Sequence, residues 1–313
     1  FSRQWLAVAV GFVQVHTIFL AAYRVFGAAA VGGLATSDYG RFVIPARDEG
    51  ETMPFAEVNN QTIHYVDSGG DGPVILLSHG FSMGHEMWAP QVGPLTEAGW
   101  RVVTYDERGW GQTVYTEPFT YWDLADDALA LLDHLGVDSA VLGGMSQGGF
   151  LTVRAALAAP ERVRAIVIVD SDANALNDEE RAQFQGLFDA ATADGLAGPV
   201  GDILAGVLFA PGFDAAIWRA KWNAKPVSAW MAAKECLFER DATDDRLGEI
   251  TCPAIVFHGE VDAAIPLERG RAMADGFGGA TTFVPVPGAG HSSNLENPAV
   301  VNPALLEFLA SLN

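Results

Sequence analysis

The stretch Val141-Leu142-Gly143-Gly144-Met145-Ser146-Gln147-Gly148-Gly149 decides how this sequence folds. A short apolar run ends in the pattern Gly-x-Ser-x-Gly, and the following residues 150–158 are compatible with a helix. This order predicts a nucleophile elbow, a sharp strand-to-helix turn that lifts the Ser146 hydroxyl clear of a sheet. The glycines leave room for neighbouring backbone, and the amino terminus of the helix favours negative charge near the serine.

Composition excludes several classes of protein. The chain has 313 residues, half of them hydrophobic, which suits one large domain with an insertion or two small domains and argues against a disordered protein. A formal net charge of −21 leaves no basic surface for the phosphates of nucleic acid or for anionic lipid. We therefore expect a small-molecule partner, no nucleic acid and no membrane association, and the sequence leaves a homodimer open.

The negative net charge comes with a shortage of lysine: Asp and Glu total 39, while only three lysines occur. A carboxylate-rich surface stays soluble where salt screens repulsion, so the pattern indicates either a saline habitat or a genome that prefers Arg to Lys. If the saline interpretation holds, activity should not fall steadily between zero and about 1 M salt. The two cysteines, Cys236 and Cys252, indicate buried or free thiols rather than a disulfide framework.

Residues 1–40 are expected to form an apolar, helical amino-terminal extension. Residues 5–23 are largely apolar, with Gln14 and His16 in the middle. The segment resembles a secretory signal or an anchor, but its polar centre is a poor match to a membrane span. We expect an appended helix and a cytoplasmic protein, with a secreted or periplasmic location as the alternative if residues 1–35 act as a signal.

From residue 55 onward the pattern becomes regular. A hairpin is predicted around Asn59-Asn60-Gln61, followed by short apolar runs at 74–78, 102–105, 140–143, 165–169, 254–258 and 281–286. Continuous apolar runs that alternate with helical periodicity predict an α/β fold with a mostly parallel sheet flanked by helices. Residues 177–242 hold helical segments only, so a helical cap is predicted after the sixth strand, with 41–176 and 243–313 as the core.

A serine hydroxyl needs a base to activate it, and the base needs an acid to orient it. Downstream of Ser146 the chain supplies both in order. Asp262 follows the apolar run that ends at His258, and His291 precedes the last predicted helix. His291 is favoured as the base over the six other histidines, and Asp170, which follows the preceding strand, is the alternative acid.

Four motifs together resemble the α/β-hydrolase fold superfamily: Ser78-His79-Gly80-Phe81, Asp106-Glu107-Arg108-Gly109-Trp110-Gly111, the elbow, and Gly288-Ala289-Gly290-His291. The resemblance runs from about residue 55 to the end of the chain and is strongest to small carboxylesterases and enol-lactone hydrolases. It implies Ser146 as nucleophile, His291 as base and acid, and Asp262 as orienting acid, with no metal and no cofactor. It also implies an oxyanion hole made by the backbone N–H groups of Phe81 and Gln147.

Three residues near these motifs are expected to have structural roles. His79 should shape the loop in which it lies. Arg108 and Asp106 should hold their own loop through an ion pair.

The expected activity is hydrolysis of small to medium carboxylic esters through an acyl-enzyme intermediate. One alternative is a carbon–carbon bond hydrolase of aromatic meta-cleavage products, whose substrate-carboxylate arginine would be Arg181, Arg219 or Arg240 among the cap residues. A lactonase or perhydrolase would use the same triad, and a non-catalytic binding module is disfavoured because all three triad residues are present. Seven side chains are predicted to line an apolar substrate pocket: Met83, Met145, Trp110, Phe209, Trp218, Trp222 and Trp230.

Overall fold

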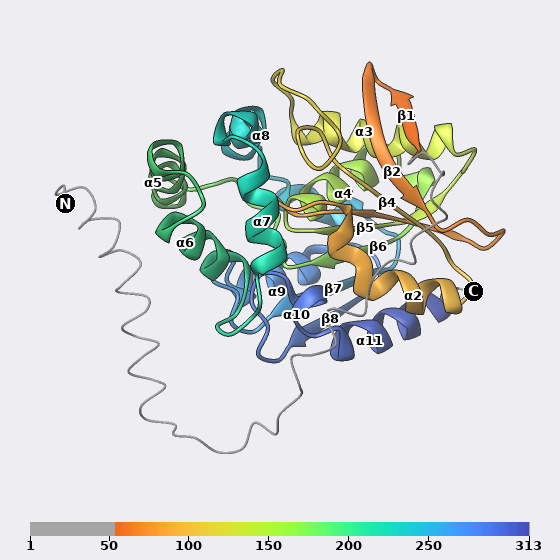
Figure 1. Ribbon diagram of the computed structural model, residues 1–313. Coiled ribbons are helices and arrows are strands. Elements are labelled where there is room, and N and C mark those ends of the chain that lie inside the picture. Colours follow the sequence, from red (N-terminus) through yellow and green to blue (C-terminus); the bar gives the residue numbers. More distant parts are fainter. Residues whose placement is uncertain (1–53, 313) are drawn as a thin grey trace, which may run out of the picture.

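The computed structural model describes residues 54–312, which form one eight-stranded sheet in the order β1-β2-β4-β3-β5-β6-β7-β8 (Figure 1). The strands are β1 (Phe55–Val58), β2 (Gln61–Asp67), β3 (Val74–Ser78), β4 (Arg101–Tyr105), β5 (Ala140–Met145), β6 (Val163–Val169), β7 (Ala254–Gly259) and β8 (Thr281–Val286). β2 pairs antiparallel with β1 and β4, and all other pairs are parallel. The predicted fold class, α/β with a mostly parallel sheet, is confirmed.

The hairpin that opens the sheet has a two-residue turn. Val58 pairs with Gln61, so Gln61 belongs to β2 rather than to the predicted turn. Asn59 and Asn60 have φ values of 47° and 59°. Both lie in the left-handed region, which asparagine tolerates better than most residues and which a tight hairpin turn requires.

Helices cover both faces of the sheet (Figure 1). On one face α3 (Tyr121–His134) packs on α4 (Gln147–Ala158), and α4 packs on β5 and β6. On the other face α2 (Ala89–Glu97) packs on α11 (Pro298–Ala310), which also contacts β7 and β8. α9 (Leu267–Gly276) connects β7 to β8 in the same direction along the sheet as α4 connects β5 to β6, so the right-handed crossover places it on the α4 face. Because β3, β5 and β7 are covered on both sides, every residue in them is buried, and this explains their unbroken apolar runs.

The ends of α3 follow the sequence signals. Thr120 and Asp123 form a capping box, in which each side chain accepts from the other residue's backbone N–H. After the last turn, Gly136 adopts a φ of 66°, the left-handed conformation that glycine supplies most easily. The helix therefore begins and ends where short-range chemistry directs it.

The expected ion pair between Arg108 and Asp106 is not formed. Arg108 instead donates from Nε and Nη2 to both carboxylate oxygens of Asp127 on α3, at 2.5 and 2.8 Å. Asp106 accepts from Nδ1 of His64 and of His85, each at 2.9 Å. A buried guanidinium is best satisfied by a carboxylate that accepts two parallel hydrogen bonds from it. Asp127 on the inward face of α3 provides that carboxylate, although Asp106 is nearer to Arg108 in the sequence.

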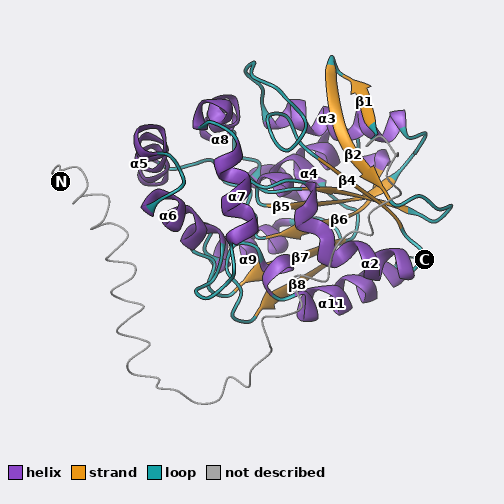
Figure 2. Ribbon diagram, viewed as in Figure 1, coloured by secondary structure: helices purple, strands orange, loops and turns teal. Residues whose placement is uncertain are grey.

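A helical insertion follows the sixth strand, as predicted. Between β6 and β7 lie α5 (Asp178–Asp194), α6 (Pro199–Leu208), α7 (Ala216–Ala224) and α8 (Met231–Phe238). Figure 2 shows this group as helices and loops set beside the ends of the strands. Trp222 Nε1 on α7 donates to the Ser82 carbonyl oxygen at 2.9 Å, which ties the insertion to the loop after β3. The remaining helices are short: η2 (His85–Trp88), η3 (Pro160–Arg162), η4 (Val227–Trp230), η5 (Asp244–Glu249) and α10 (Ser293–Glu296).

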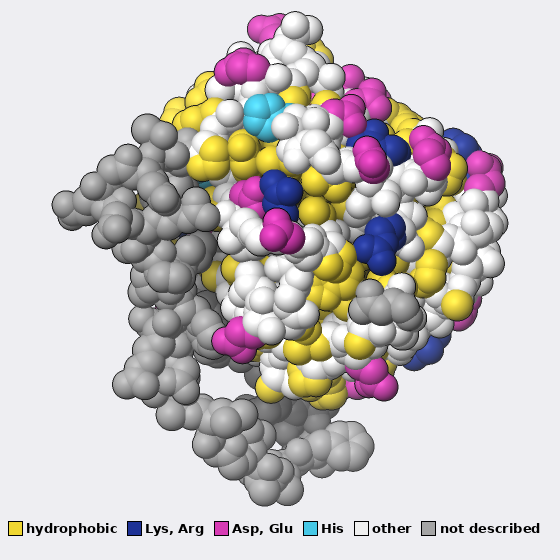
Figure 3. All heavy atoms as spheres, turned by 90° about the vertical axis from the view of Figure 1, so that its right-hand side faces the viewer, with side chains coloured by type: hydrophobic (Ala, Val, Ile, Leu, Met, Phe, Trp, Pro, Cys, Tyr) yellow, Lys and Arg dark blue, Asp and Glu magenta, His cyan; other side chains and the backbone are white. Residues whose placement is uncertain are grey.

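The predicted extension, residues 1–40, lies outside the described residues, as do residues 41–53 of the predicted core. Within residues 54–312, no helix combines the length and the apolar character needed to cross a membrane. On the face in Figure 3, acidic side chains are scattered among apolar and neutral ones, with basic side chains between them. The described residues on this face therefore form no continuous basic surface, in keeping with the net charge.

Candidate active site

Ser146 occupies the turn between β5 and α4, with a φ of 50° and a ψ of −111°. A positive φ is strained for a residue with a side chain, so the surroundings must hold it. The Ser146 N–H donates to the Val169 carbonyl oxygen at 2.9 Å, and Ser171 Oγ donates to the Ser146 carbonyl oxygen at 2.8 Å. Both contacts come from β6 and the segment after it, which fixes the serine from the neighbouring strand.

The glycines of the elbow are required by close backbone contacts. A Cβ on Gly144 would lie 2.0 Å from the Gly148 carbonyl oxygen, and one on Gly148 would lie 2.4 Å from the Ser78 carbonyl oxygen. These contacts are with backbone atoms, which cannot swing aside. Gly144 therefore lets the start of α4 fold back onto β5, and Gly148 lets it approach the end of β3.

His291 and Asp262 meet Ser146 in a hydrogen-bonded series. His291 Nε2 lies 2.9 Å from Ser146 Oγ, and His291 Nδ1 lies 2.7 Å from Asp262 Oδ2. The other oxygen of Asp262 accepts from the N–H groups of Ala264 and Ile265 at 2.8 and 2.9 Å. The structure thus brings the three predicted residues together, from the ends of β5, β7 and β8.

Electrostatics strengthen this arrangement. Burial acts to lower the pKa of His291, but the Asp262 charge and hydrogen bond outweigh it and raise that pKa. Burial acts to raise the pKa of Asp262, but the charge of His291 and the hydrogen bonds from two imidazoles lower it instead. Asp262 therefore stays ionised, and it holds the His291 proton on Nδ1 so that Nε2 can accept one from Ser146.

The alternative acid, Asp170, is close by but makes other bonds. Its two oxygens accept from the backbone N–H groups of Gly259 and Ser293 at 2.8 and 2.7 Å. Burial, and then the nearby Asp262 charge, raise the pKa of Asp170. Asp170 thus joins β7 to the loop that carries His291, while Asp262 makes the direct bond to the imidazole.

His258 is a member of this cluster that the sequence indicates only as the end of a strand. Its Nε2 lies 3.2 Å from Asp262 Oδ2 and 2.8 Å from the Ile265 carbonyl oxygen. Burial acts to lower the pKa of His258, but the hydrogen bond to Asp262 and the Asp170 charge raise it to about 9. The spacing of four residues between His258 and Asp262 is a visible signal, but only the turn after β7 makes it a contact.

The predicted oxyanion donors lie in adjacent loops. β3 and β5 are parallel neighbours with Ser78 beside Gly144, so the residues that follow them, including Phe81 and Gln147, leave the sheet at the same edge. Within residues 54–312 neither the Phe81 nor the Gln147 backbone N–H has a hydrogen-bond acceptor. Phe81 and Ser146 line the same cavity. Two backbone donors are thus available beside the serine.

His79 holds the loop that carries Phe81. Its Nδ1 donates to the Gly80 carbonyl oxygen at 2.8 Å, and its Nε2 accepts from the Glu107 N–H at 3.0 Å. Burial lowers the pKa of His79, which suits a neutral ring with one donor and one acceptor nitrogen. These bonds match the predicted role of His79 in shaping the loop.

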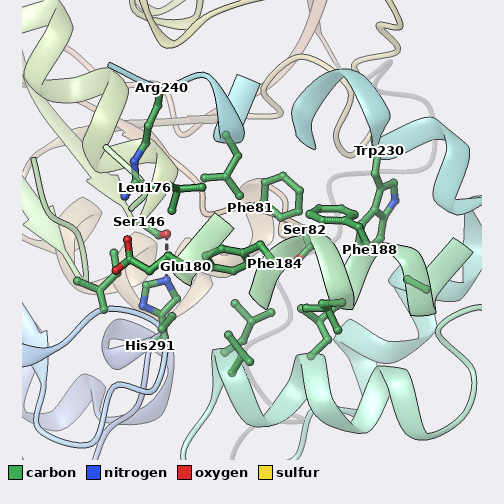
Figure 4. A pocket seen from close by; sticks show the side chains of 18 of the residues that line it. Phe81, Ser82, Ser146, Leu176, Glu180, Phe184, Phe188, Trp230, Arg240 and His291 are labelled. Atoms are coloured by element: carbon green, nitrogen blue, oxygen red, sulfur yellow. Dashed lines mark hydrogen bonds between the residues drawn. The ribbon is translucent and has the colours of Figure 1, made fainter. Parts of the chain in front are cut away.

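A cavity of about 850 Å³, open solvent at its mouth included, lies between the sheet and the insertion (Figure 4). Ser146 and His291 are part of its wall. Most of the remaining lining is apolar and comes from α5, α6 and the loops around them, including Leu176, Phe184, Leu187, Phe188, Leu204, Val207 and Leu208. The cavity therefore offers an apolar surface to an acyl or alkyl group attached to the serine.

Of the seven predicted pocket residues, only Trp230 lines this cavity. The six that do not line it are buried in packing contacts: Met83, Met145, Trp110, Phe209, Trp218 and Trp222. Trp110 lies behind the wall, with its ring centroid 4.8 Å from Phe81 and 5.2 Å from Trp230. Phe209 stacks on Phe213 at 4.4 Å.

The sequence favours the wrong aromatic residues because apolar character alone does not say which side of a helix meets the cavity. The sequence favours large aromatic rings, whereas in the structure leucine, valine and phenylalanine side chains of α5 and α6 line the cavity. Three charged residues also line the cavity: Glu180 and Arg269, which the sequence did not indicate, and Arg240. The sequence marks Arg240 only as one of three candidate cap arginines.

Two clusters among the described residues each bring three potential metal-ligand atoms within 4.8 Å of one another: His64, His85 and Asp106, and Asp170, His258 and Asp262. In the first, the Asp106 oxygens also accept the backbone N–H groups of His85 and Gln112, at 3.0 and 2.9 Å. In the second, all four Asp170 and Asp262 oxygens accept N–H donors. The carboxylate oxygens of both clusters are therefore occupied by hydrogen bonds, while Nδ1 of His258 is buried without a partner among the described residues.

Comparisons with known proteins agree with this geometry. A family model described as the alpha/beta hydrolase fold matches residues 73–298. A Variovorax paradoxus protein provisionally named a carbamate hydrolase is 30% identical over 271 residues, covering 80% of this chain and 97% of its own. A Thermogutta terrifontis esterase superposes with a TM-score of 0.75 at 27% identity, covering 84% of this chain and 99% of its own. The enol-lactonase of Burkholderia xenovorans superposes with a TM-score of 0.74 at 26% identity, covering 82% of this chain and 100% of its own. With its strand order, its elbow and this family match, the chain belongs to the α/β-hydrolase fold family.

Proposed function

We propose that this protein is a serine hydrolase that cleaves small to medium carboxylic esters through an acyl-enzyme intermediate. The observation that carries the proposal is the series Ser146 Oγ, His291 and Asp262, joined at 2.9 and 2.7 Å in the wall of an apolar cavity. The esterase and the enol-lactonase among the similar structures support this substrate class.

In the first half of the reaction, Ser146 Oγ attacks the ester carbonyl carbon while its proton passes to His291 Nε2. The Asp262 carboxylate stabilises the resulting imidazolium through Nδ1. The N–H groups of Phe81 and Gln147 donate hydrogen bonds to the negatively charged former carbonyl oxygen, and each such donor contributes about 3 kcal/mol in other serine hydrolases. The carbon–oxygen bond to the alcohol breaks, and His291 gives its proton to the departing oxygen.

In the second half, water replaces the alcohol. His291 takes a proton from the water as its oxygen attacks the acyl carbon, and the Ser146–acyl bond breaks with return of that proton to Ser146 Oγ. The carboxylic acid leaves. A lactone, which is a cyclic ester, would react by the same steps with its alcohol still attached to the acyl group.

A carbon–carbon hydrolase is the second candidate function, and the position of Arg240 favours it. Arg181 and Arg219 pair with Glu239 and Asp202 outside the cavity, whereas Arg240 lines it. In that reaction Arg240 would receive the carboxylate of a ring-fission product, but it already pairs with the buried Asp172 at 3.3 Å, which ranks this candidate below the esterase.

A series of p-nitrophenyl esters from acetate to laurate, with Ser146→Ala as the paired variant, tests the proposal. We expect hydrolysis that depends on chain length and is lost in Ser146→Ala. A folded protein that hydrolyses none of these esters, but turns over a ring-fission dienoate, would replace the esterase by the carbon–carbon hydrolase.

A further inference from the structure

The cavity beside Ser146 has one charged side in an otherwise apolar lining. Glu180, Arg240 and Arg269 line it, and the buried Asp172 lies behind the two arginines. We refer to these four residues as the polar wall. Figure 4 shows Arg240 and Glu180 on the same side of the view as Ser146 and His291, whereas Phe188 and Trp230 lie at the other end.

The polar wall is fixed to the elbow. Asp172 stands two residues after Asp170 and directly after Ser171, whose hydroxyl donates to the Ser146 carbonyl oxygen at 2.8 Å. A Cβ on Gly149 would lie 2.4 Å from Ser171 Oγ, so the segment lies tightly against α4. The position of the charged groups is therefore tied to the position of the nucleophile.

Each arginine takes one oxygen of Asp172. Arg240 Nη2 donates to Oδ1 at 3.3 Å, and Arg269 Nη1 donates to Oδ2 at 3.1 Å. Arg240 Nε donates to the Asn174 carbonyl oxygen at 2.8 Å, and the Arg240 guanidinium lies 4.1 Å from the Phe150 ring centroid. Arg269 Nη2 also pairs with Glu180 at 2.5 Å.

These contacts do not use all the guanidinium N–H donors of the two arginines. Among the described residues, Arg240 Nη1 and Arg269 Nε have no hydrogen-bond acceptor, although the Arg240 side chain is only 5% exposed. Neither of these two nitrogens is sealed inside the protein, and the Arg269 side chain is 28% exposed, so both are donors that a ligand can reach. An acceptor brought by a ligand would form a charge-assisted hydrogen bond there. Both arginines face the cavity, so the substrate is the group that can supply it.

Charge balance decides what kind of acceptor fits. The polar wall carries two guanidinium groups and two carboxylates, so its formal charge is zero. A substrate carboxylate placed there would add an uncompensated negative charge to a buried site that already contains two carboxylates, Asp170 and Asp262, against the single imidazolium of His258. A neutral oxygen acceptor satisfies the free N–H without that penalty.

We propose that the polar wall binds a neutral oxygen acceptor, a carbonyl or ether oxygen, carried by the substrate a few atoms from the ester that Ser146 attacks. This inference rests on the proposed ester hydrolysis and narrows its substrate class. The preferred substrates are oxygen-bearing esters or lactones with an apolar arm toward Phe188 and Trp230. Anionic esters are disfavoured.

Matched pairs of esters test the proposal in the full-length protein. Ethyl 4-oxopentanoate is compared with ethyl pentanoate, and 2-methoxyethyl pentanoate with butyl pentanoate, so that each pair differs by one oxygen function. We expect a roughly tenfold higher kcat/KM for the oxygen-bearing member of at least one pair, and a ratio near one in Arg240→Met. Arg240→Lys, which keeps the charge but loses the planar fork, guards against a folding defect and should also reduce the ratio.

Arg181→Met is the matched control, because Arg181 is a cap arginine that lies outside the cavity, and its ratio should equal that of the wild type. Ratios near one in the wild type for both pairs, or ratios that persist in both Arg240 variants, would overturn the proposal. So would faster hydrolysis of monoethyl butanedioate than of ethyl 4-oxopentanoate.

Binding to Ser146→Ala, measured by calorimetry with ethyl 4-oxopentanoate and ethyl pentanoate, separates this inference from the proposed function. Preferential binding of the oxo ester without any ester turnover in the wild type would remove the esterase and keep the polar wall. Turnover of ethyl pentanoate without any preference would do the reverse.

Discussion

His258 Nε2 lies 3.2 Å from Oδ2 of Asp262, the same oxygen that His291 Nδ1 contacts at 2.7 Å. The pKa of His258 is raised to about 9, which favours the protonated form of its ring at neutral pH. The positive charge of protonated His258 acts to lower the pKa of His291, and His258 shares the Asp262 carboxylate oxygen with His291. We therefore infer that His258 is a positioning residue for His291 and Asp262, the pair proposed to activate Ser146.

Loss of the His258 charge should raise the pKa of His291. In His258→Asn we expect the acid limb of the pH profile of kcat/KM to move to higher pH by up to about one unit, because the charge and the competing hydrogen bond both disappear. His134→Gln, at an exposed position, is the control and should leave the limb in place. An unmoved limb in a folded His258→Asn variant would show that His258 only fills space.

Glu296 should make stability depend on pH. Its oxygens accept from the N–H groups of Ala210, Gly290 and Ser292, which joins the insertion to the residues flanking His291. Burial nevertheless raises its pKa to about 7. Between its ordinary value of 4.5 and about 7 the native state holds a proton that the unfolded chain releases, so this group's contribution to stability falls as pH rises.

Denaturant unfolding at several pH values measures this effect. The free energy of unfolding of the wild type should decrease relative to that of Glu296→Gln by up to about 3 kcal/mol between pH of about 5 and 8. Glu268→Gln, at an exposed position, should give a constant difference across the same range. A constant difference for Glu296→Gln as well would contradict the linkage.

The elbow should not tolerate a methyl group at Gly148. In Gly148→Ala the new Cβ would lie 2.4 Å from the Ser78 carbonyl oxygen and 2.8 Å from that of His79. We expect a loss of at least about 2 kcal/mol in the free energy of unfolding, together with most of the activity. Gly206→Ala is the control: it lies in α6 with open space around it and should stabilise by about 0.5–1 kcal/mol. Equal effects of the two changes would refute the packing argument.

The buried ion pair between Arg108 and Asp127 should matter more than a surface pair. Asp127→Asn leaves a buried guanidinium without its carboxylate, and we expect a cost of about 3–5 kcal/mol in chemical denaturation. Asp133→Asn breaks the pair between Arg162 and the 66% exposed side chain of Asp133, and should cost less than about 1 kcal/mol. If the two variants lose similar free energies of unfolding, burial does not determine how much the Arg108–Asp127 pair stabilises the protein.

The sequence by itself determined the strands, the elbow and the placement of the helical insertion. These features depend on short-range patterns: an apolar run buried on both faces, Asn59-Asn60 in a tight turn, Thr120 at a helix start, and glycines around Ser146. The order of serine, acid and histidine along the chain was equally visible. Local chemistry is sufficient for such features because the residues that impose them are neighbours in the chain.

Only the tertiary structure decided which groups meet. It gave Asp262 rather than Asp170 the bond to His291, brought Asp127 to Arg108, and assembled the polar wall from Asp172, Glu180, Arg240 and Arg269. It also turned α5 and α6, rather than the tryptophans of α7, toward the cavity. Contacts between distant segments depend on how the strands pair and on which face of each helix turns inward, and spacing along the chain carries neither.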